Sequence, residues 1–442
     1  MRDLDQREHA YEHGRKCRND APRSEQGRWE PGKDRDPLAI VQEAVQGRLP
    51  GLLPIRVERM SASPFGFFRG AAAVMAADLA GLPHSGIRTQ ICGDAHVLNL
   101  GSYEAPDGRL IFDINDFDET ISAPWEWDVK RLATSLVLSG REAGVPKSRR
   151  REAVMALACR YRSTLGQLCR LSVLEVARYQ VHRSLKATPV ASVLHRAQRA
   201  TPRQSLKKLA EQKGKARWEF RKQPLQHQPP LLRPVRGEEK DQVLASLPAY
   251  RETLAPERQY VFDSYRPEAV GFKVVGTGSV GLRDYVVLMF GRGADDPLLL
   301  QVKEEPPSCY ARRLSPPPEP LHQGQRVVCG QRLMQAQSDI LLGWTSIEGH
   351  NYLVRQLSDH KASIDVKTLR GPGLVPYAEV CGEVLAKGHA HATNPCLIAG
   401  YLGTSARFDE ALAEFASAYA DQTEKDWESF VAANRKRSAR RR

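Results

Sequence analysis

Residues 93–99 read GDAHVLN, and residues 115–119 read NDFDE. The first stretch sets an amide, Asn99, five residues after an acid, Asp94. The second stretch gathers carboxylates at the predicted end of a strand, where their mutual repulsion is unfavourable unless a cation relieves it. Carboxylates and amides are also the oxygen ligands that Mg²⁺ prefers. A local turn held by Asp and Asn is the alternative for the first stretch, but the second stretch favours a cation site.

Each of these stretches follows a short predicted strand. Residues 89–92 form a strand that enters the first stretch, and residues 109–114 (RLIFDI) form a strand that follows an Asp-Gly turn signal. We expect the two strands to pair as one hairpin that presents Asp94, Asn99 and Asp116 at the same rim. Phosphoryl transfer from ATP needs a carboxylate near the accepting hydroxyl and oxygen ligands for Mg²⁺, and this rim would supply both.

Length and composition set the broad class of protein. A chain of 442 residues is too long for one simple domain, so we expect two or three lobes. No run of eighteen apolar residues occurs, which argues against a membrane-spanning helix. The charged N-terminus lacks the apolar core of a secretion signal. The eight cysteines include no CxxC pair, which predicts reduced thiols in a cytoplasmic protein rather than a disulfide framework or a zinc site.

The formal net charge of +13 is concentrated in two segments. Residues 201–240 carry eleven basic and four acidic side chains, and residues 435–442 (RKRSARRR) carry six basic side chains and no acid. The rest of the chain is balanced, so the basic character does not belong to the acidic motifs. For the C-terminal run, a solvated, disordered tail is the simpler interpretation, and weak contact with nucleic acid or an acidic surface is the alternative.

Changes in composition divide the chain into six parts. They are a flexible lead-in (1–36), the acidic motifs with their helices (37–182), a basic segment with a linker (183–249), a β-rich part (250–360), a helical part (361–434) and a basic tail (435–442). Apolar spacing and helix propensity predict helices over 37–50, 69–81, 127–144, 147–182, 324–338, 376–392 and 407–433. Three successive antiparallel strands are predicted within 270–305 and a further strand over 352–357, with breaker-rich connections over 223–237 and 315–320.

Residues 276–281 read GTGSVG, a GxGxxG motif that is weak evidence alone because glycine-rich hairpins are common. A dinucleotide-binding fingerprint would turn directly into a helix, whereas here LRDYVVLMF continues as a strand. The context favours a glycine-rich hairpin over phosphates. The last strand of this region ends at Lys303, which is costly to bury unless an anion such as a phosphate pairs with it; a lysine that reaches solvent is the alternative.

These motifs resemble a known class of enzymes. Gly93-Asp94-x-His96-x-x-Asn99 resembles the catalytic loop of aminoglycoside-phosphotransferase-type kinases, and residues 115–118 resemble their metal-binding segment. Residues 124–132 (PWEWDVKRL) are similar to the helix start that follows, whose aspartate supports the catalytic loop. More specifically, six segments resemble a bacterial family classed as domain of unknown function 2252, over about residues 50–430: SPFGFFRG, CGDAHVLNLG, FDINDFDE, PWEWDVKRLA, GQRLMQAQSDILLGW and VRQLSDHKAS.

The kinase resemblance implies a role for each matching residue. Asp94 would orient or deprotonate the acceptor hydroxyl, while Asn99 and Asp116 would hold Mg²⁺ with Asp118 as a second acidic ligand. His96 would be a proton carrier or, as is more common, a hydrogen-bonded structural histidine. The ATP-phosphate contacts implied are Gly276, Thr277, Gly278, Ser279, Gly281, Lys303 and, more weakly, Arg69.

The order of the motifs differs from that of ordinary kinases, in which the glycine loop and lysine precede the catalytic loop. We therefore predict an α+β, two-lobed, protein-kinase-like fold in circularly permuted order. The predicted activity is Mg-ATP-dependent phosphotransfer to an unidentified hydroxyl. Transfer of AMP would use the same residues, and a nucleic-acid-associated protein that acts through its basic segments is a further alternative.

One departure from the kinase pattern argues for weak or absent catalysis. Kinases hold the strand lysine with a glutamate on the next helix, but residues 324–338 contain no acid, and Cys329 lies near the expected position. Gln325, Gln331 or Gln335 could hydrogen-bond the lysine without supplying a countercharge. Glutamates 304 and 305 adjoin Lys303 and would point elsewhere or only partly toward it. A non-catalytic nucleotide-binding regulator is therefore an alternative.

Overall fold

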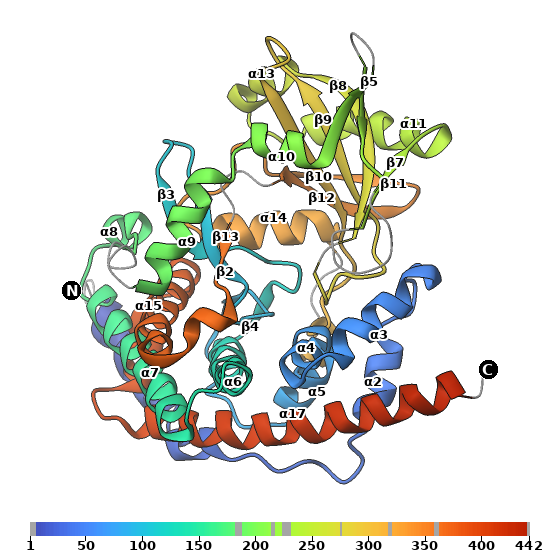
Figure 1. Ribbon diagram of the computed structural model, residues 1–442. Helices are drawn as coiled ribbons and strands as arrows, with labels where there is room; N and C mark the ends of the chain where they lie inside the picture. Colours follow the sequence, from blue (N-terminus) through green and yellow to red (C-terminus); the bar gives the residue numbers. More distant parts are fainter. Residues whose placement is uncertain are drawn as a thin grey trace.

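The computed structural model describes residues 6–181, 188–213, 217–222, 231–274, 276–316, 321–357 and 362–439. The chain is a mixed α+β protein with several antiparallel sheets. A six-stranded sheet lies at one end of the molecule, helices fill the other end, and α14 (Gln323–Met334) runs between them (Figure 1). We refer to these two regions as the sheet part and the helical part.

The sheet part is built on strands in the spatial order β11-β12-β10-β9-β8-β7, with each neighbouring pair antiparallel. The strand bounds are β7 (Leu231–Val235), β8 (Arg266–Val274), β9 (Asp284–Phe290), β10 (Pro297–Glu304), β11 (Gly343–Ile347) and β12 (His350–Gln356). The three antiparallel strands predicted within 270–305 are confirmed as β8, β9 and β10, and the strand predicted over 352–357 as β12.

Strand alternation gives this sheet two buried faces. Leu298, Leu300 and Val302 of β10 share one hydrophobic cluster with α11, α12 and α13, while Leu299 lies in another cluster with α10, β5 and β6. A strand whose residues are apolar on both faces is expected to be covered on both sides. The covering elements are α10 (Pro202–Leu209), β5 (Ala210–Lys213), β6 (Arg217–Phe220), α11 (Glu238–Ala245), α12 (Leu247–Arg251) and α13 (Pro256–Asp263).

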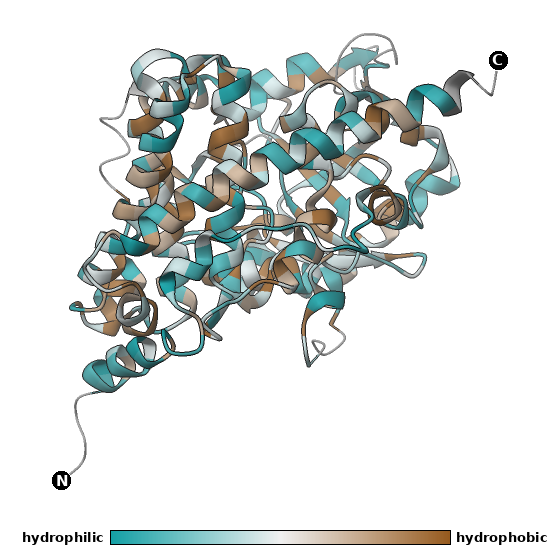
Figure 2. Cartoon of the chain, turned by 90° about the horizontal axis from the view of Figure 1, so that it is seen from below, coloured by the Kyte–Doolittle hydropathy of each residue, from teal (hydrophilic) through white to brown (hydrophobic). Residues whose placement is uncertain are grey.

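The helical part surrounds α6 (Glu126–Glu142), whose residues from Glu126 to Gly140 are all buried. Against it pack α7 (Lys147–Leu168), α15 (Leu374–Ala392) and α17 (Arg407–Ala439), and α16 (Pro395–Leu402) packs on α7. Gly382 allows α15 to approach α7 closely, because a Cβ there would lie 2.4 Å from the carbonyl oxygen of Leu157. Seen from below, hydrophilic and hydrophobic segments alternate along the helix that leads to the C-terminus (Figure 2), as expected for a helix with one buried face.

The N-terminal region is ordered rather than the flexible lead-in that its composition predicts. It contains α1 (Gln6–Lys16), the short 3-10 helix η1 (Arg23–Gly27), α2 (Pro37–Glu43), η2 (Pro50–Leu52), α3 (Leu53–Ser61), α4 (Pro64–Gly70) and α5 (Ala72–Ala80). Arg35 bridges Asp78 of α5 and Asp426 of α17 through buried ion pairs of 2.7 and 2.6 Å. These long-range contacts, which composition does not reveal, fix the lead-in on the helical part.

The predicted hairpin is wrong in its pairing. β1 (Arg88–Ile91) pairs with β4 (Ile121–Pro124), whereas β3 (Leu110–Ile114) pairs with β2 (Leu100–Glu104), and β2 also pairs with the short β13 (Ala362–Ser363). The Asp-Gly turn thus joins β2 to β3, because residues 100–104 form a strand that the sequence analysis did not identify. The two acidic motifs still meet, since they occupy the connections β1–β2 and β3–β4.

Several predicted boundaries also move. The helix expected over 147–182 ends at Leu168 and is followed by α8 (Val173–Arg178), and the helix expected over 37–50 ends at Glu43. β7 lies in the predicted linker 223–237, of which residues 223–230 fall outside the described residues; most of the predicted loop 315–320 does too. α17 continues to Ala439, into the tail expected to be disordered. The remaining elements are α9 (Thr188–Arg199), η4 (Ala311–Arg313), η5 (Val366–Leu369) and η6 (Gly371–Gly373).

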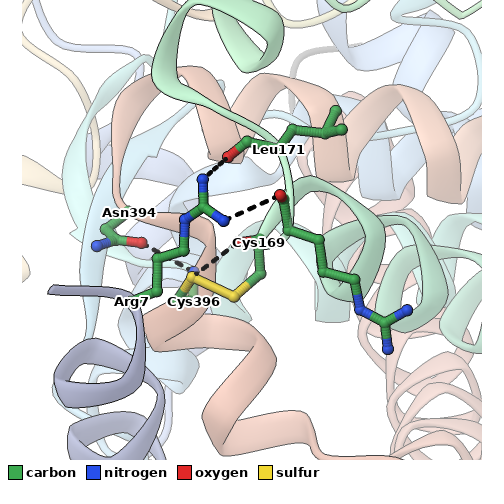
Figure 3. Close-up of a disulfide and its surroundings, with 6 residues drawn as sticks. Arg7, Cys169, Leu171, Asn394 and Cys396 are labelled. Atoms are coloured by element: carbon green, nitrogen blue, oxygen red, sulfur yellow. Dashed lines mark hydrogen bonds between the residues drawn. A yellow bond between two sulfur atoms is a disulfide. The ribbon is translucent and has the colours of Figure 1, made fainter. Parts of the chain in front are cut away.

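Cys169 and Cys396 form a disulfide, contrary to the prediction that all the thiols are reduced. Figure 3 shows the bond with Arg7 beside it; this arginine donates hydrogen bonds of 3.1 Å to the carbonyl oxygens of Arg170 and Leu171. The bond joins the end of α7 to the start of α16, which lie 227 residues apart in sequence. Within the described ranges, no helix has both the length and the apolar character needed to cross a membrane.

Candidate functional site

The loop after β1 carries Asp94 and is held from below by α6. The carboxylate of Asp128 accepts hydrogen bonds from the backbone N–H groups of Cys92 (2.8 Å) and Gly93 (2.9 Å). Gly93 has a φ of 84°, and a Cβ there would lie 2.3 Å from the carbonyl oxygen of Glu119, so only glycine fits. The kinase resemblance implies that Asp128, the aspartate of PWEWD, supports this loop. The structure shows such support as a pair of hydrogen bonds.

Asp94 is engaged by a buried arginine. Arg131 of α6 donates from Nε to Oδ1 of Asp94 at 2.6 Å and from an Nη atom to the carbonyl oxygen of Phe68 at 3.1 Å. Burial raises the pKa of Asp94, and the positive charge of Arg131 opposes this shift. His96 Nε2 lies 3.7 Å from Asp94 Oδ2, and burial lowers the pKa of this imidazole well below its ordinary value. His96 is therefore neutral at pH 7.

Asp116 and Asp118 occupy the connection between β3 and β4, beside the amine of Lys303. Lys303 Nζ forms an ion pair with Oδ2 of Asp118, while Oδ1 of Asp118 is buried without a hydrogen-bond partner among the described residues. Burial acts to raise the pKa of Asp118, but Lys303 offsets it and holds this pKa below its ordinary value. Burial and then the charge of Asp118 raise the pKa of Asp116. The two carboxylates are thus electrostatically distinct although they are two residues apart.

The glycine-rich turn between β8 and β9 is clamped by arginines from the N-terminal region. Arg48 donates to the carbonyl oxygens of Gly278 and Val280 at 2.7 Å each, and Arg56 donates to those of Thr277 (3.0 Å) and Gly278 (2.6 Å). In a trans peptide the N–H points opposite to the carbonyl. The backbone N–H groups that follow these carbonyls therefore point away from the arginines.

The counter-ion of Lys303 does not come from the following helix. In α14, Gln335 donates to the carbonyl oxygen of Ile114 at 2.6 Å, and Gln331 donates to Gln335 at 3.1 Å, so neither serves the lysine. The second carboxylate near Lys303 is that of Glu305, whose Oε1 lies 3.7 Å from Nζ. Glu304 points elsewhere, as expected, since strand alternation places it on the opposite face of β10.

These residues converge on one cavity of about 280 Å³. Of the predicted site residues, those lining it are Arg69, Asp94, His96, Asn99, Asp116, Asp118, Gly276, Thr277, Gly278 and Ser279. Lys303 is absent from the lining but contacts it through its ion pair with Asp118. Gly281 lies at the end of the glycine turn, where its φ is 98° and a Cβ would lie 2.9 Å from the Cβ of Arg48. The structure thus brings together motifs about 180 residues apart.

The sequence analysis missed several polar residues of this site. Arg48, Arg56 and Glu305 line the cavity, and Arg131 fixes Asp94. The sequence analysis named Glu305 but expected it to point elsewhere or only partly toward Lys303; strand alternation favours the orientation toward Lys303, because residues two apart share a face. Nothing in the sequence near Arg48 or Arg56 indicates that they reach a turn more than 200 residues away.

The donor atoms fit a cation that a ligand helps to coordinate, rather than a metal held by protein alone. Among the described residues, no group of three or more His, Cys, Asp or Glu side chains has an arrangement that could hold a metal ion. Asp116, Asp118 and Asn99 nevertheless line one cavity, and the free Oδ1 of Asp118 is an available ligand. Mg²⁺ commonly binds through one or two carboxylates, with phosphate and water completing its shell. The side chains present fit such a shared site.

Part of the basic segment 201–240 is neutralised by acids. Glu219 pairs with Lys213 (2.7 Å) and with Arg236, and Arg203 pairs with Asp295 at 3.0 Å. Surface pairs of this kind contribute little stability, but they balance part of the positive charge. Four of the residues involved belong to the segment singled out for nucleic-acid contact, which weakens that alternative without testing it.

Comparison with known proteins identifies a family. Residues 48–433 match a family described as uncharacterized proteins conserved in bacteria (DUF2252). The match agrees with the bacterial family resemblance found in the sequence, over nearly the same residues. No curated protein and no solved structure matches the chain.

Proposed function

The chain belongs to the DUF2252 family, and we propose that it is a Mg-ATP-dependent phosphotransferase with a circularly permuted, protein-kinase-like fold. The acceptor would be a hydroxyl group on a substrate that the sequence does not identify. In this permuted order, the sheet part would bind ATP, although it follows the acidic motifs in the chain. The proposal rests on the residues of one cavity rather than on any likeness of the whole chain to a solved protein.

The observation that carries the proposal is the meeting of two motifs far apart in sequence. The acidic loops around Asp94 and Asp116 line the same cavity as the glycine turn 276–279. Lys303, near the end of β10, the second strand after this turn, forms an ion pair with Asp118, 185 residues earlier in the chain. A glycine turn, a strand lysine and a pair of acidic loops are the parts that kinases use to hold a nucleotide and an acceptor.

Each group would have a defined task in the transfer. Asp94, held in place by Arg131, would orient the acceptor hydroxyl toward the γ-phosphate. Asn99, Asp116 and Asp118 would hold Mg²⁺, which when bound neutralises charge on the phosphate oxygens. The glycine turn, whose residues 276–279 line the cavity, would lie against the phosphates. Arg69, whose Nε is buried without a hydrogen-bond partner among the described residues, would add a charge-assisted contact.

A second candidate function is nucleotide binding without transfer. It is favoured by the ion pair between Asp94 and Arg131, since this contact occupies the carboxylate that would otherwise receive the proton of the acceptor. Transfer of AMP instead of phosphate would use the same cavity. The two transfers differ in which phosphorus of ATP remains attached to the product.

The test is thermal unfolding with ATP and Mg²⁺, followed by labelling. We expect Mg-ATP to raise the melting temperature of the native chain, and Asp116→Asn and Lys303→Ala to abolish this rise. If neither substitution alters the shift, the proposed site is wrong. ATP labelled at the γ-phosphorus should then label an acceptor from a bacterial extract, whereas label from the α-phosphorus alone would indicate AMP transfer. Stabilisation without transfer of either label would favour the binding-only candidate.

A further inference from the structure

We propose that Glu305 is the alternate partner of Lys303, to which the lysine moves when a divalent cation occupies Asp118. This inference rests on the proposed function in one respect, because it takes the cation site at Asp118 as given. It assigns to the residue that directly follows β10 the part that kinases give to a helix glutamate. Glu305 would be a positioning residue, since it acts on the cation site through Lys303.

The position of Glu305 is set by the strand. Glu305 directly follows β10, which ends at Glu304, and continuation of the strand alternation places its side chain on the same side as that of Lys303. Its backbone is fixed there by a hydrogen bond of 2.8 Å from its N–H to the carbonyl oxygen of Asn351. Glu305 also lines the cavity that contains Asp116 and Asp118.

The carboxylate of Glu305 is unusual because it is buried and unsatisfied. Its side chain is 0% exposed, and neither oxygen has a hydrogen-bond partner among the described residues. Its ion-pair neighbour is Lys303, at 3.7 Å, too far for a hydrogen bond. The nearby Arg326 is already engaged, since it donates to the carbonyl oxygens of Thr120, Asp118 and Pro306. A buried acceptor without a donor is unfavourable, so a state that supplies one is favoured.

Cation binding would supply that state. Lys303 Nζ is paired with Oδ2 of Asp118. A divalent cation that binds this carboxylate must therefore share the carboxylate with the ammonium group or displace the ammonium group. Two positive charges on one carboxylate repel each other. A small movement of the flexible lysine side chain would bring Nζ from 3.7 Å to hydrogen-bond distance of Glu305. Asp118 would then be free for the cation, and Glu305 would gain a donor.

The adjacent Glu304 provides a matched control. It lies on the opposite face of β10, forms an ion pair with Arg283 (3.1 Å), and its Oε1 lies 3.0 Å from Nδ1 of His350. Glu304→Gln therefore removes a carboxylate from the same strand without changing the surroundings of Lys303. Both substitutions keep the size and shape of the side chain.

The test is Mn²⁺ binding, measured by electron paramagnetic resonance without nucleotide. We expect Glu305→Gln to weaken Mn²⁺ binding about tenfold, as is typical when a group behind a metal ligand is lost, and Glu304→Gln to leave the affinity unchanged. In a Lys303→Met background, Glu305→Gln should have no further effect, because no lysine then needs an alternate partner. If Glu305 were itself a metal ligand, Glu305→Gln would weaken Mn²⁺ binding both in the native chain and in Lys303→Met. If Glu305 were only structural, Glu305→Gln would weaken Mn²⁺ binding in neither. Either result would overturn the exchange.

A crystal structure of the native chain with Mn²⁺ gives a second readout that does not depend on a variant. We expect Lys303 Nζ within about 3.2 Å of Glu305, and an ammonium still bound to Asp118 would contradict the exchange. If the native chain binds no Mn²⁺, both the exchange and the cation site of the proposed function fail. If Mn²⁺ binding follows the expected pattern but no group transfer from ATP is found, the exchange stands and the phosphotransferase proposal fails.

Discussion

Replacement of Lys303 by methionine should destabilise the protein in a pH-dependent way. The side chain of Lys303 is 4% exposed, and its ammonium group lies between Asp118 and Glu305. Opposite unit charges about 4 Å apart attract by roughly 4 kcal/mol at an effective dielectric constant of about 20, which sets the scale for the pair that Lys303 forms with Asp118. Because the loss of one partner leaves buried carboxylates uncompensated, we expect the free energy of unfolding to fall by about 3–5 kcal/mol at pH 7.5.

The sign of the pH dependence follows from the carboxylates. In the native chain, Lys303 holds the pKa of Asp118 below its ordinary value, so this carboxylate stabilises the fold above pH 4 and loses that contribution as the pH falls. In Lys303→Met, the charge of the lysine no longer opposes burial. The pKa of Asp118 is then expected above its unfolded value, and those of Asp116 and Glu305, which burial already raises in the native chain, are expected to rise further. Such groups favour the fold at low pH and lose that contribution as the pH rises. The free energy of unfolding that the variant loses relative to the native chain should therefore be small near pH 4.5 and largest at pH 7.5.

The assay is urea denaturation followed by circular dichroism at the two pH values, with a chelator present. Lys367→Met is the control, because Lys367 is exposed and its loss should change stability by less than about 0.5 kcal/mol. A deficit of Lys303→Met that is equal at both pH values, or below about 1 kcal/mol at pH 7.5, would refute the argument that Lys303 compensates a buried cluster of acids.

Three further predictions concern other parts of the molecule. Asp128→Asn should lower stability by about 2–4 kcal/mol and the melting temperature by roughly 2–4 °C, since its amide group cannot accept from both Cys92 and Gly93; an unchanged melting curve would be inconsistent with this support. Burial raises the pKa of Asp284 to about 6, above its unfolded value, so from pH 4 to 7 the native chain should lose about 2 kcal/mol that Asp284→Asn retains. Parallel stability curves for these two chains would argue against that shift. If nucleic-acid binding dominates, salt-sensitive DNA retention should survive Asp116→Asn and fail when residues 435–442 are removed; we expect no such retention.

Local signals predicted the elements better than their pairing. The alternation of apolar residues identified β8, β9 and β10, and the spacing of apolar residues located α6, α15 and α17. The hairpin was misassigned because residues 100–104 (LGSYE) have a weak strand signal, yet they form β2 between two partners. Pairing depends on such tertiary contacts more than on local propensity.

For the candidate site, the sequence indicated the groups but not their neighbours. The resemblance to kinases, together with the context of the glycine motif and the apolar flank of Lys303, connected two segments about 180 residues apart. The clamp of Arg48 and Arg56 on the glycine turn arises from packing between distant parts of the chain. The same is true of the disulfide between Cys169 and Cys396, because spacing alone does not reveal which cysteines meet.

The central claim is that the cavity binds ATP through a cation held by the acidic motifs. Isothermal titration of the native chain with ATP, with and without Mg²⁺, tests it most directly, with Asp116→Asn as the matched variant. The account predicts saturable one-to-one binding that requires Mg²⁺ and is lost in Asp116→Asn while the variant remains folded. Absence of binding to the native chain, or equal affinity in Asp116→Asn, would contradict it.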